Sequence, residues 1–481
     1  MNMWDFLCER MRAYLEALLF DGEEQCTYQQ MLEQAVHMGE TLESVCPAGT
    51  KCAILCSSGI HTALGLLACW YANMIPIPMS VHYGMRHWKG IVTSTQPALL
   101  ITDQEHVDLH ILQYHLGEER FLGERPAADP DPGLKDAAVI LCTSGTTGTP
   151  KGVILSTQGL QQNVEKIHRY FAVKSKDRIL IARPLYHCAV LVGEFLTALC
   201  GGLDIGFFDE KYSPAAVLQF ARKHKISVLG GTPTLLHHLS AFIRRDGEPH
   251  RIRAIAISGE CLQEPVARRI RQGFPGTDIY HVYGLTEAGP RVSWLPPESF
   301  DQMPTSVGIP LAGVQIKIGE EDGTPLPAYT HGHIFVRTPC RMLGYYNDRD
   351  ATDRVFVDGW LNTGDIGYQD ALGYLFILSR ADDRIIQGGM NIYPREVEAG
   401  LAELTFIQEC MVYGAAGKVG QHIAAAVVLR PEYREMTEKE LLAHMETVLA
   451  PYQMPSELQV VEALPRNASG KIIRRRPTCT G

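Results

Sequence analysis

Short apolar runs typical of strands alternate with helical stretches through about the first 300 residues of the 481-residue chain. The run 52–55 precedes a helix expected at 61–72, and the run 226–229 precedes a helix expected at 232–242. Strands that alternate with helices in this way form largely parallel sheets with helices on their faces. The chain is therefore predicted to be an α/β protein built from layered sheets.

The pattern changes twice toward the C-terminus. From about 307 to 377, short strands are separated by Gly, Pro, Asp and Asn, which predicts a small antiparallel, barrel-like β unit. The last segment, of about a hundred residues, contains a helix that begins with a capping box at Thr437. Because a chain of this length exceeds one ordinary core, we expect a large N-terminal domain at 1–381 and a small α+β domain at 382–481.

One run of the chain has the chemistry of a phosphate-binding loop. Residues 143–153 combine hydroxyl side chains, glycines and a lysine between two strand-like runs, so amides, hydroxyls and an ammonium can all turn toward phosphate oxygens. The ordinary P-loop pattern fails, because Pro150 and Gly152 stand where a glycine and a hydroxyl residue are required. The alternative is a simple turn in a β-hairpin. The predicted phosphate contacts are Thr143, Ser144, Gly145, Thr146, Thr147 and Lys151.

The composition argues against several other classes of protein. Lys and Arg number 44 against 54 Asp and Glu, so the net charge of −10 gives no field that would attract nucleic acid or an anionic membrane. The 13 cysteines contain no CxxC pair, which argues against a zinc site or a disulfide framework and favours a reducing cytoplasm. Residues 52–85 carry no charge but are interrupted by Pro, Gly, Ser and Asn, so we expect buried elements there and no stable membrane insertion.

The run at 143–153 resembles the phosphate-binding signature of the adenylate-forming superfamily, which includes acyl-CoA synthetases, the adenylation domains of peptide synthetases and beetle luciferases. A second segment, 283–287, follows an expected strand and is similar to the superfamily's Tyr-Gly-x-Thr-Glu motif. In α/β sheets, ligands bind at such strand ends. The resemblance implies that Tyr283 stacks on adenine, that Thr286 contacts a phosphate, and that Glu287 holds catalytic Mg²⁺ on phosphate oxygens.

Further motifs follow in the superfamily's order. Asp365 stands in the Thr-Gly-Asp segment, where the resemblance implies that its carboxylate accepts from both ribose hydroxyls. Arg380 and Asp382 form the Arg-x-Asp segment. The resemblance implies that Arg380 contacts the ribose or a phosphate and that Asp382 is the hinge of a mobile C-terminal domain. Gly389 lies in a loop similar to the one that acyl-CoA synthetases bring to the active site for thioester formation. Lys471 is implied as the catalytic lysine, which neutralises charge on the carboxylate and the α-phosphate during adenylation.

The acid-binding region has a less specific signature. Residues 184–188 resemble the synthetases' Pro-Leu-aromatic-His motif, which implies a catalytic role for His187. Adenylation domains for α-amino acids usually hold an aspartate in this region. Its absence favours a simple carboxylic acid, although an aspartate or glutamate elsewhere can still receive a β-amino group. Few bulky charges among the implied pocket residues predict room for an apolar acyl chain or a ring. These residues are Tyr186, Gly193, Gly231, Ser258 and Leu285, with Gly259 and Glu260 assigned to the nucleotide.

Together these motifs predict a two-step ligation. The acid attacks the α-phosphate of Mg·ATP to give an acyl-adenylate and pyrophosphate, and a thiol then displaces AMP. Coenzyme A is the expected thiol. The alternative acceptor is the phosphopantetheine of a free-standing carrier protein, with aryl and β-amino acids among the substrates. Two other classes stay open: a luciferase-like oxygenase, which light emission would reveal, and a nucleotide-binding regulatory protein that releases no pyrophosphate.

Overall fold

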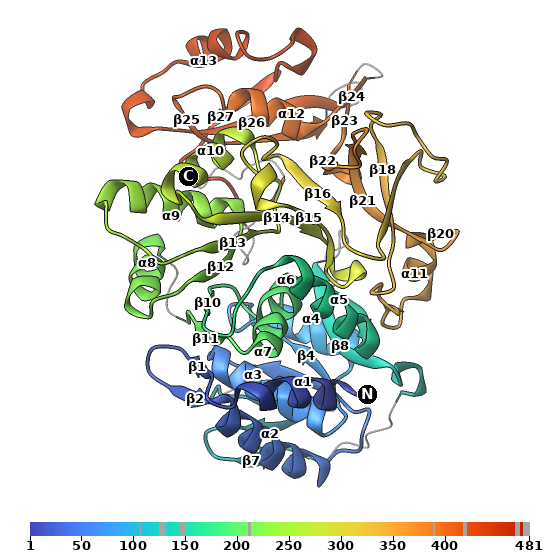
Figure 1. Cartoon of the computed structure of the whole chain (residues 1–481). Coiled ribbons are helices and arrows are strands. Elements are labelled where there is room, and N and C mark those ends of the chain that lie inside the picture. The colour runs from blue at the N-terminus through green and yellow to red at the C-terminus, as the bar shows by residue number, and fades with distance from the viewer. Residues whose placement is uncertain are drawn as a thin grey trace.

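Figure 1 shows a computed structural model of the chain, which describes residues 1–105, 107–124, 131–144, 150–209, 213–387, 390–416, 421–466 and 472–474. The N-terminal layers lie at the bottom of this view and the C-terminal elements at its top, with the largest sheet between them (Figure 1). The order of elements confirms the α/β class predicted from the alternation of strands and helices.

A five-stranded sheet forms the first layer, in the order β4-β3-β5-β6-β7, and its strands are parallel except for the last pair. Ser58 caps helix α3 by accepting hydrogen bonds from the amides of Ile60 and His61. The uncharged run at 52–85 thus holds a buried strand, a helix and a second strand, and no helix among the described residues is long and apolar enough to cross a membrane. The elements are α1 (Met3–Met11), α2 (Tyr28–Glu43), β3 (Lys51–Leu55), α3 (Gly59–Tyr71), β4 (Ile75–Pro78), α4 (Met85–Thr95), β5 (Leu99–Thr102), β6 (Leu112–His115) and β7 (Arg120–Leu122).

The largest sheet has 14 strands, with the order β17-β18-β21-β22-β16-β15-β14-β13-β12-β10-β11-β1-β2 and β20 beside β21. Its strands from β1 to β14 in this order pair in parallel, whereas those from β14 to β17 pair antiparallel. The antiparallel unit expected at 307–377 is therefore present, and it continues the parallel sheet through β16. The strands are β1 (Leu18–Phe20), β2 (Gln25–Thr27), β10 (Arg178–Ile181), β11 (Asp204–Phe207), β12 (Val228–Gly231), β13 (Ala254–Ile257), β14 (Asp278–Gly284), β15 (Arg291–Leu295), β16 (Ser306–Pro310), β17 (Gln315–Gly319), β18 (Gly332–Arg337), β20 (Phe356–Val357), β21 (Trp360–Gln369) and β22 (Leu375–Arg380).

Helices between these strands begin at residues that cap them. Ser156 accepts from the Gly159 amide at the start of α5, and Thr232 accepts from the Leu235 amide at the start of α9. The apolar face of α5 is buried, with Leu160, Val164 and Ile167 on it. The helices are α5 (Thr157–Tyr170), α6 (Cys188–Val190), α7 (Thr197–Gly201), α8 (Pro214–Lys223), α9 (Pro233–Asp246), α10 (Glu264–Gly273) and α11 (Arg349–Val355).

The glycine- and threonine-rich run joins two strands of a small antiparallel sheet. β8 (Ala137–Ser144) pairs with β9 (Pro150–Ser156), and β9 pairs in turn with β19 (Gly344–Tyr345). The hairpin that served as the alternative interpretation of this run is therefore real. A hairpin and a phosphate-binding loop are compatible, because the strands fix only the two ends of the loop.

The C-terminal elements have a hydrophobic core of their own, which extends from Ile385 to Leu449. Thr437 and Glu440 form the predicted capping box at the start of α13. The placement of the domain boundary at Asp382 stays a prediction. The elements are β23 (Ile385–Gln387), β24 (Met390–Ile392), α12 (Pro394–Leu401), β25 (Ile407–Ala416), β26 (Gln421–Leu429), α13 (Glu438–Met445) and β27 (Glu457–Val460).

Candidate active site

The motif at 283–287 lies at the carboxyl end of β14, as predicted. Tyr283 and Gly284 end the strand, and Thr286 begins a single 3-10 turn that holds Glu287. A Cβ atom added to Gly284 would lie 1.5 Å from the carbonyl oxygen of Pro290. Glycine is required here because only a residue without a side chain allows the two backbone segments to approach so closely.

Asp365, the predicted ribose ligand, lies beside Tyr283 and Arg380. The Tyr283 hydroxyl donates to Asp365 Oδ2 over 2.6 Å, and Arg380 Nη1 lies 3.3 Å from Asp365 Oδ1. Asp365 and Arg380 are direct partners across β21 and β22, so the sheet register itself brings them together. Burial, followed by the charge of Asp365, raises the pKa of Tyr283 well above its usual value, so the phenol stays protonated and donates.

Glu287, the predicted magnesium ligand, contacts Tyr345 on β19. The Tyr345 hydroxyl donates to Glu287 Oε1 over 2.9 Å, and Lys151 Nζ lies 5.0 Å from the centre of the Tyr345 ring. Burial and then the charge of Glu287 raise the pKa of Tyr345, so this phenol also remains a donor. One fixed carboxylate beside a cationic phosphate-loop residue fits Mg²⁺, which is usually held by one or two carboxylates plus substrate phosphates. No cluster of three or more metal-ligating side chains occurs in the described part of the chain.

Tyr345→Phe is expected to raise the Mg²⁺ concentration needed for half-maximal adenylation about tenfold, because a hydrogen bond to a charged group contributes about 1.5 kcal/mol or more. Magnesium titrations of pyrophosphate release measure the effect. Tyr346→Phe is the matched control, since the neighbouring hydroxyl contacts Lys51 instead of Glu287. An unchanged magnesium requirement in Tyr345→Phe would contradict the proposed role of the Glu287 contact.

The structure places only the ends of the phosphate loop. Thr143 and Lys151 face each other across β8 and β9, and Thr143 is half-buried. Gly145, Thr146 and Thr147 lie outside the described residues, as does the side chain of Ser144. Their predicted phosphate contacts therefore stay predictions.

Tyr186 and His187 lie together on the segment that precedes α6. Their ring centres are 4.2 Å apart, and the Tyr186 ring lies 5.6 Å from that of Tyr83. Burial, and then the nearby charge of Arg183, lowers the pKa of His187 to about 3. The imidazole is consequently neutral at physiological pH, which suits hydrogen bonding and stacking better than charge neutralisation.

The predicted pocket residue Gly193 and the nearby Gly230 lie against charged side chains, which the sequence interpretation missed. The Gly193 backbone meets the guanidinium of Arg291, where an added Cβ would lie 2.4 Å from Nη2. Gly230 meets the carboxylate of Glu194, which forms an ion pair with Arg183. Arg183 Nη2 also reaches the hydroxyl of the predicted pocket residue Ser258 over 3.3 Å. The sequence analysis did not predict these charged side chains, and the expectation that the pocket has room for an apolar chain or a ring stays a prediction. The resemblance to the superfamily assigned no role to Arg183, Glu194 or Arg291.

The remaining residues of this region have mixed surroundings. Gly231 faces Leu236 of α9, where an added Cβ would lie 2.9 Å from Cγ. Gly259 adopts a positive φ of +93°, which favours glycine. Glu260 Oε2 accepts from the Thr234 hydroxyl over 2.9 Å. Leu285 packs beside Tyr283 at the edge of the core formed by β15 to β22.

The C-terminal predictions are only partly described. Asp382 lies in a 3-10 turn directly after β22. Gly389 and Lys471 fall outside the described residues, and their roles stay predictions. Arg466 and Ile472, on either side of the lysine motif, form an isolated β-bridge, and Arg474 pairs with Glu398 of α12.

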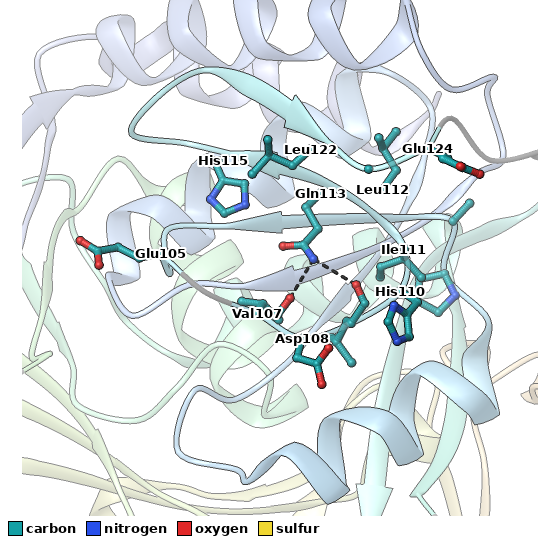
Figure 2. Close-up of a pocket in the computed structure, with 14 residues that line it drawn as sticks. Glu105, Val107, Asp108, His110, Ile111, Leu112, Gln113, His115, Leu122 and Glu124 are labelled. Atoms are coloured by element: carbon teal, nitrogen blue, oxygen red, sulfur yellow. Dashed lines mark hydrogen bonds between the residues drawn. The ribbon is translucent and has the colours of Figure 1, made fainter.

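A separate cleft of about 980 Å³ lies at the first sheet, beside β6, β7 and the segment that precedes β6 (Figure 2). Gln113 lies in its wall and donates to the carbonyl oxygens of Val107 and Leu109 over 2.9 and 3.0 Å. Its described lining residues run from Pro97 to Glu124 and include none of the predicted site residues. This cleft is therefore distinct from the candidate active site.

The fold and the arrangement of these motifs define the class of adenylate-forming enzymes. The chain belongs to the AMP-binding enzyme family: the family model matches residues 9–346, and the model of the AMP-binding enzyme C-terminal domain matches residues 396–471.

Proteins similar to this chain include several acid–CoA ligases. A 2-succinylbenzoate–CoA ligase from Bacillus velezensis is 32% identical over 96% of this chain and 94% of its own length. A feruloyl-CoA synthase from an Amycolatopsis species is 29% identical over 98% of this chain and 97% of its own. Among solved structures, o-succinylbenzoate CoA synthetase from Bacillus subtilis with its acyl-adenylate intermediate superposes with a TM-score of 0.86, at 28% identity, over 98% of this chain and 97% of that one. The same enzyme has also been solved with ATP and magnesium ion.

Proposed function

We propose that the contacts described above form the site of an AMP-forming acid–CoA ligase. One end of this site binds the nucleoside, and the other binds the magnesium and the phosphates. Asp365, Tyr283 and Arg380 hold the nucleoside, while Glu287, Lys151 and the phosphate loop hold the magnesium and the phosphates. The single observation that carries this assignment is the Tyr283–Asp365 hydrogen bond of 2.6 Å, because it joins two motifs separated by 82 positions into one polar group. A carboxylate fixed in this way can accept from a ribose diol with its remaining lone pairs.

The reaction is ATP-dependent activation of a carboxylic acid followed by transfer of the acyl group to coenzyme A. In the first step a carboxylate oxygen bonds to the α-phosphorus and pyrophosphate leaves. In the second step the coenzyme A sulfur bonds to the acyl carbon, its proton is lost, and AMP leaves with the bridging oxygen. Mg²⁺ supplies charge neutralisation at the phosphates when bound.

Each step assigns a role to residues of this chain. Neutral His187 and Tyr186 pack the acid against the α-phosphate side of the site, and Thr286 contacts a phosphate. Lys471 stabilises charge during adenylation, whereas Gly389 gives the pantetheine arm close access in the second step. A turn of the C-terminal domain about Asp382 exchanges these two groups between the steps.

Coenzyme A is the acceptor, and the phosphopantetheine of a free-standing carrier protein is the alternative to be tested. The cysteines that the structure describes carry free thiols, which supports the proposal of a reducing, cytoplasmic setting.

A carboxylic-acid panel tests the proposed function. Pyrophosphate release is measured for each acid with Mg·ATP, and the products formed with coenzyme A or a phosphopantetheinylated carrier protein are identified by mass. We expect acid-dependent pyrophosphate release and a coenzyme A thioester. Pyrophosphate release without any thioester, or light emission with a luciferin, would contradict this function.

A further inference from the structure

Two arginines lie near the predicted acid pocket, Arg183 partly buried and Arg291 buried, and only Arg183 has a counter-ion. Arg183 pairs with Glu194, whose side chain is 2% exposed, so this pair adds no net charge. Arg291 is itself only 2% exposed and forms no ion pair with any carboxylate of the described residues. Its Nε also has no hydrogen-bond partner there. Burying a guanidinium without a paired anion lowers the stability of the folded state, and proteins usually pair such charges.

Arg291 lies beside Gly193, one of the residues predicted to line the acid pocket. Its guanidinium lies against Gly193, in a π-helical turn (Leu191–Leu196) that begins four positions after His187. Turns of this kind are frequent at functional sites. Glycine at 193 leaves room for the guanidinium, since any added Cβ would lie 2.4 Å from Nη2.

The other polar groups near Arg291 do not neutralise it. Asn163 contacts only its backbone, through hydrogen bonds of 3.2 and 3.3 Å. Tyr170 forms a side-chain hydrogen bond with Arg291 but carries no charge, because burial raises the pKa of its phenol. Glu287 is the acidic residue nearest along the chain, but its Oε1 accepts from Tyr345.

From this imbalance, and resting on the proposed function, we propose that the activated acid carries a second carboxylate, which Arg291 binds beside Gly193. A planar guanidinium presents two parallel donors to a carboxylate and is the side chain best suited to hold one away from water. The second carboxylate supplies the missing negative charge, and the first stays free to attack ATP. Arg183 is not expected to bind a further carboxylate of the substrate, because Glu194 already neutralises its charge.

Matched pairs of acids test this inference. Each pair shares one skeleton and differs by one carboxylate, for example butyrate with succinate, benzoate with phthalate, and 4-oxo-4-phenylbutyrate with its ortho-carboxylated form. We expect kcat/KM for at least one diacid to exceed that of its partner about a hundredfold, since a site built to pair a polar group rejects the analogue without it. Equal use of both members of every pair would overturn the proposal.

Arg291→Gln separates this role from a structural one. The variant is expected to lose about a hundredfold or more in kcat/KM for the diacid, with less than about tenfold change for the monoacid. Arg291→Lys keeps the charge without the planar fork and should be intermediate. Thermal stabilisation by Mg·ATP, equal to that of the wild type, shows that the variants are folded. If Arg291→Gln instead weakens Mg·ATP and lowers every acid equally, Arg291 serves the nucleotide and the inference is wrong.

A binding measurement distinguishes failure of this inference from failure of the proposed function. The same acids are added to wild-type protein and to Arg291→Gln, and the shift in thermal midpoint is recorded without ATP. A diacid that stabilises only the wild type supports the inference even if no pyrophosphate is released, and then the proposed function fails alone. If no diacid stabilises the wild type and none is turned over, the inference fails.

Discussion

Asp365→Ala is expected to raise the KM for ATP about a hundredfold or more and to reduce adenylation to a small fraction of the wild-type rate. The carboxylate is proposed to accept from two ribose hydroxyls, and each hydrogen bond to a charged group contributes about 1.5 to 3 kcal/mol. The change also leaves the buried Tyr283 hydroxyl and Arg380 without their shared partner. ATP titrations of pyrophosphate release, with nucleotide binding measured separately by calorimetry, give both quantities.

Two variants show whether the carboxylate acts on the nucleotide or only on its neighbours. Tyr283→Phe removes the hydrogen bond of 2.6 Å but keeps the ring and Asp365, so the KM for ATP should rise only a few-fold. Asp365→Asn keeps the shape of the side chain but loses its charge. Its KM for ATP should therefore lie between those of Tyr283→Phe and Asp365→Ala. If Tyr283→Phe matches Asp365→Ala, the carboxylate serves mainly to orient Tyr283, and the assignment to ribose is wrong.

Much of the fold followed from local sequence signals. The capping box at Thr437 and the strand before Tyr283 both depend on neighbouring residues, so local sequence is enough to predict them. The hairpin between β8 and β9 was the weaker of two interpretations of residues 143–153. It proved compatible with the favoured one, because a loop's chemistry and the pairing of its flanking strands are separate properties.

The residues of the candidate site that the sequence singled out are those that stand in a motif. Tyr283, Glu287, Asp365 and Arg380 each carried a motif, although their mutual distances depend on the register of β21 with β22 and on the pairing of β9 with β19. Tyr345 had no motif and was missed for that reason.

The charged groups near the acid pocket had no comparable signal. Arg183 and Glu194 are 11 positions apart and meet only because a helical turn folds back on the end of β10. Arg291 meets Gly193 across almost a hundred positions of sequence, and an arginine at the start of a strand gives no sign that it will be buried. The sequence contained a related clue in the glycine at 193, whose missing side chain is what admits the guanidinium.

Lys471→Ala is expected to slow adenylate formation about a hundred- to a thousandfold, while thioester formation from preformed acyl-adenylate stays near the wild-type rate. The lysine is proposed to stabilise charge that develops only in the first step, and loss of such a contact typically costs about 2.7 to 4 kcal/mol. The flanking residues Arg466 and Arg474 keep their own ion pairs with Glu409 and Glu398 in this variant, so its folding should be intact. Single-turnover assays measure the two half-reactions separately.

Gly389→Trp provides the complementary control for Lys471→Ala. A bulky side chain in the proposed pantetheine route should leave acid-dependent pyrophosphate release nearly intact and slow acyl-CoA formation severely, because it obstructs the arrangement assembled for the second step. Opposite losses in the two variants would follow directly from a C-terminal domain that presents Lys471 and Gly389 in turn. If Lys471→Ala slows both half-reactions equally, or Gly389→Trp abolishes adenylation and spares thiolation, rotation about Asp382 does not order the two steps.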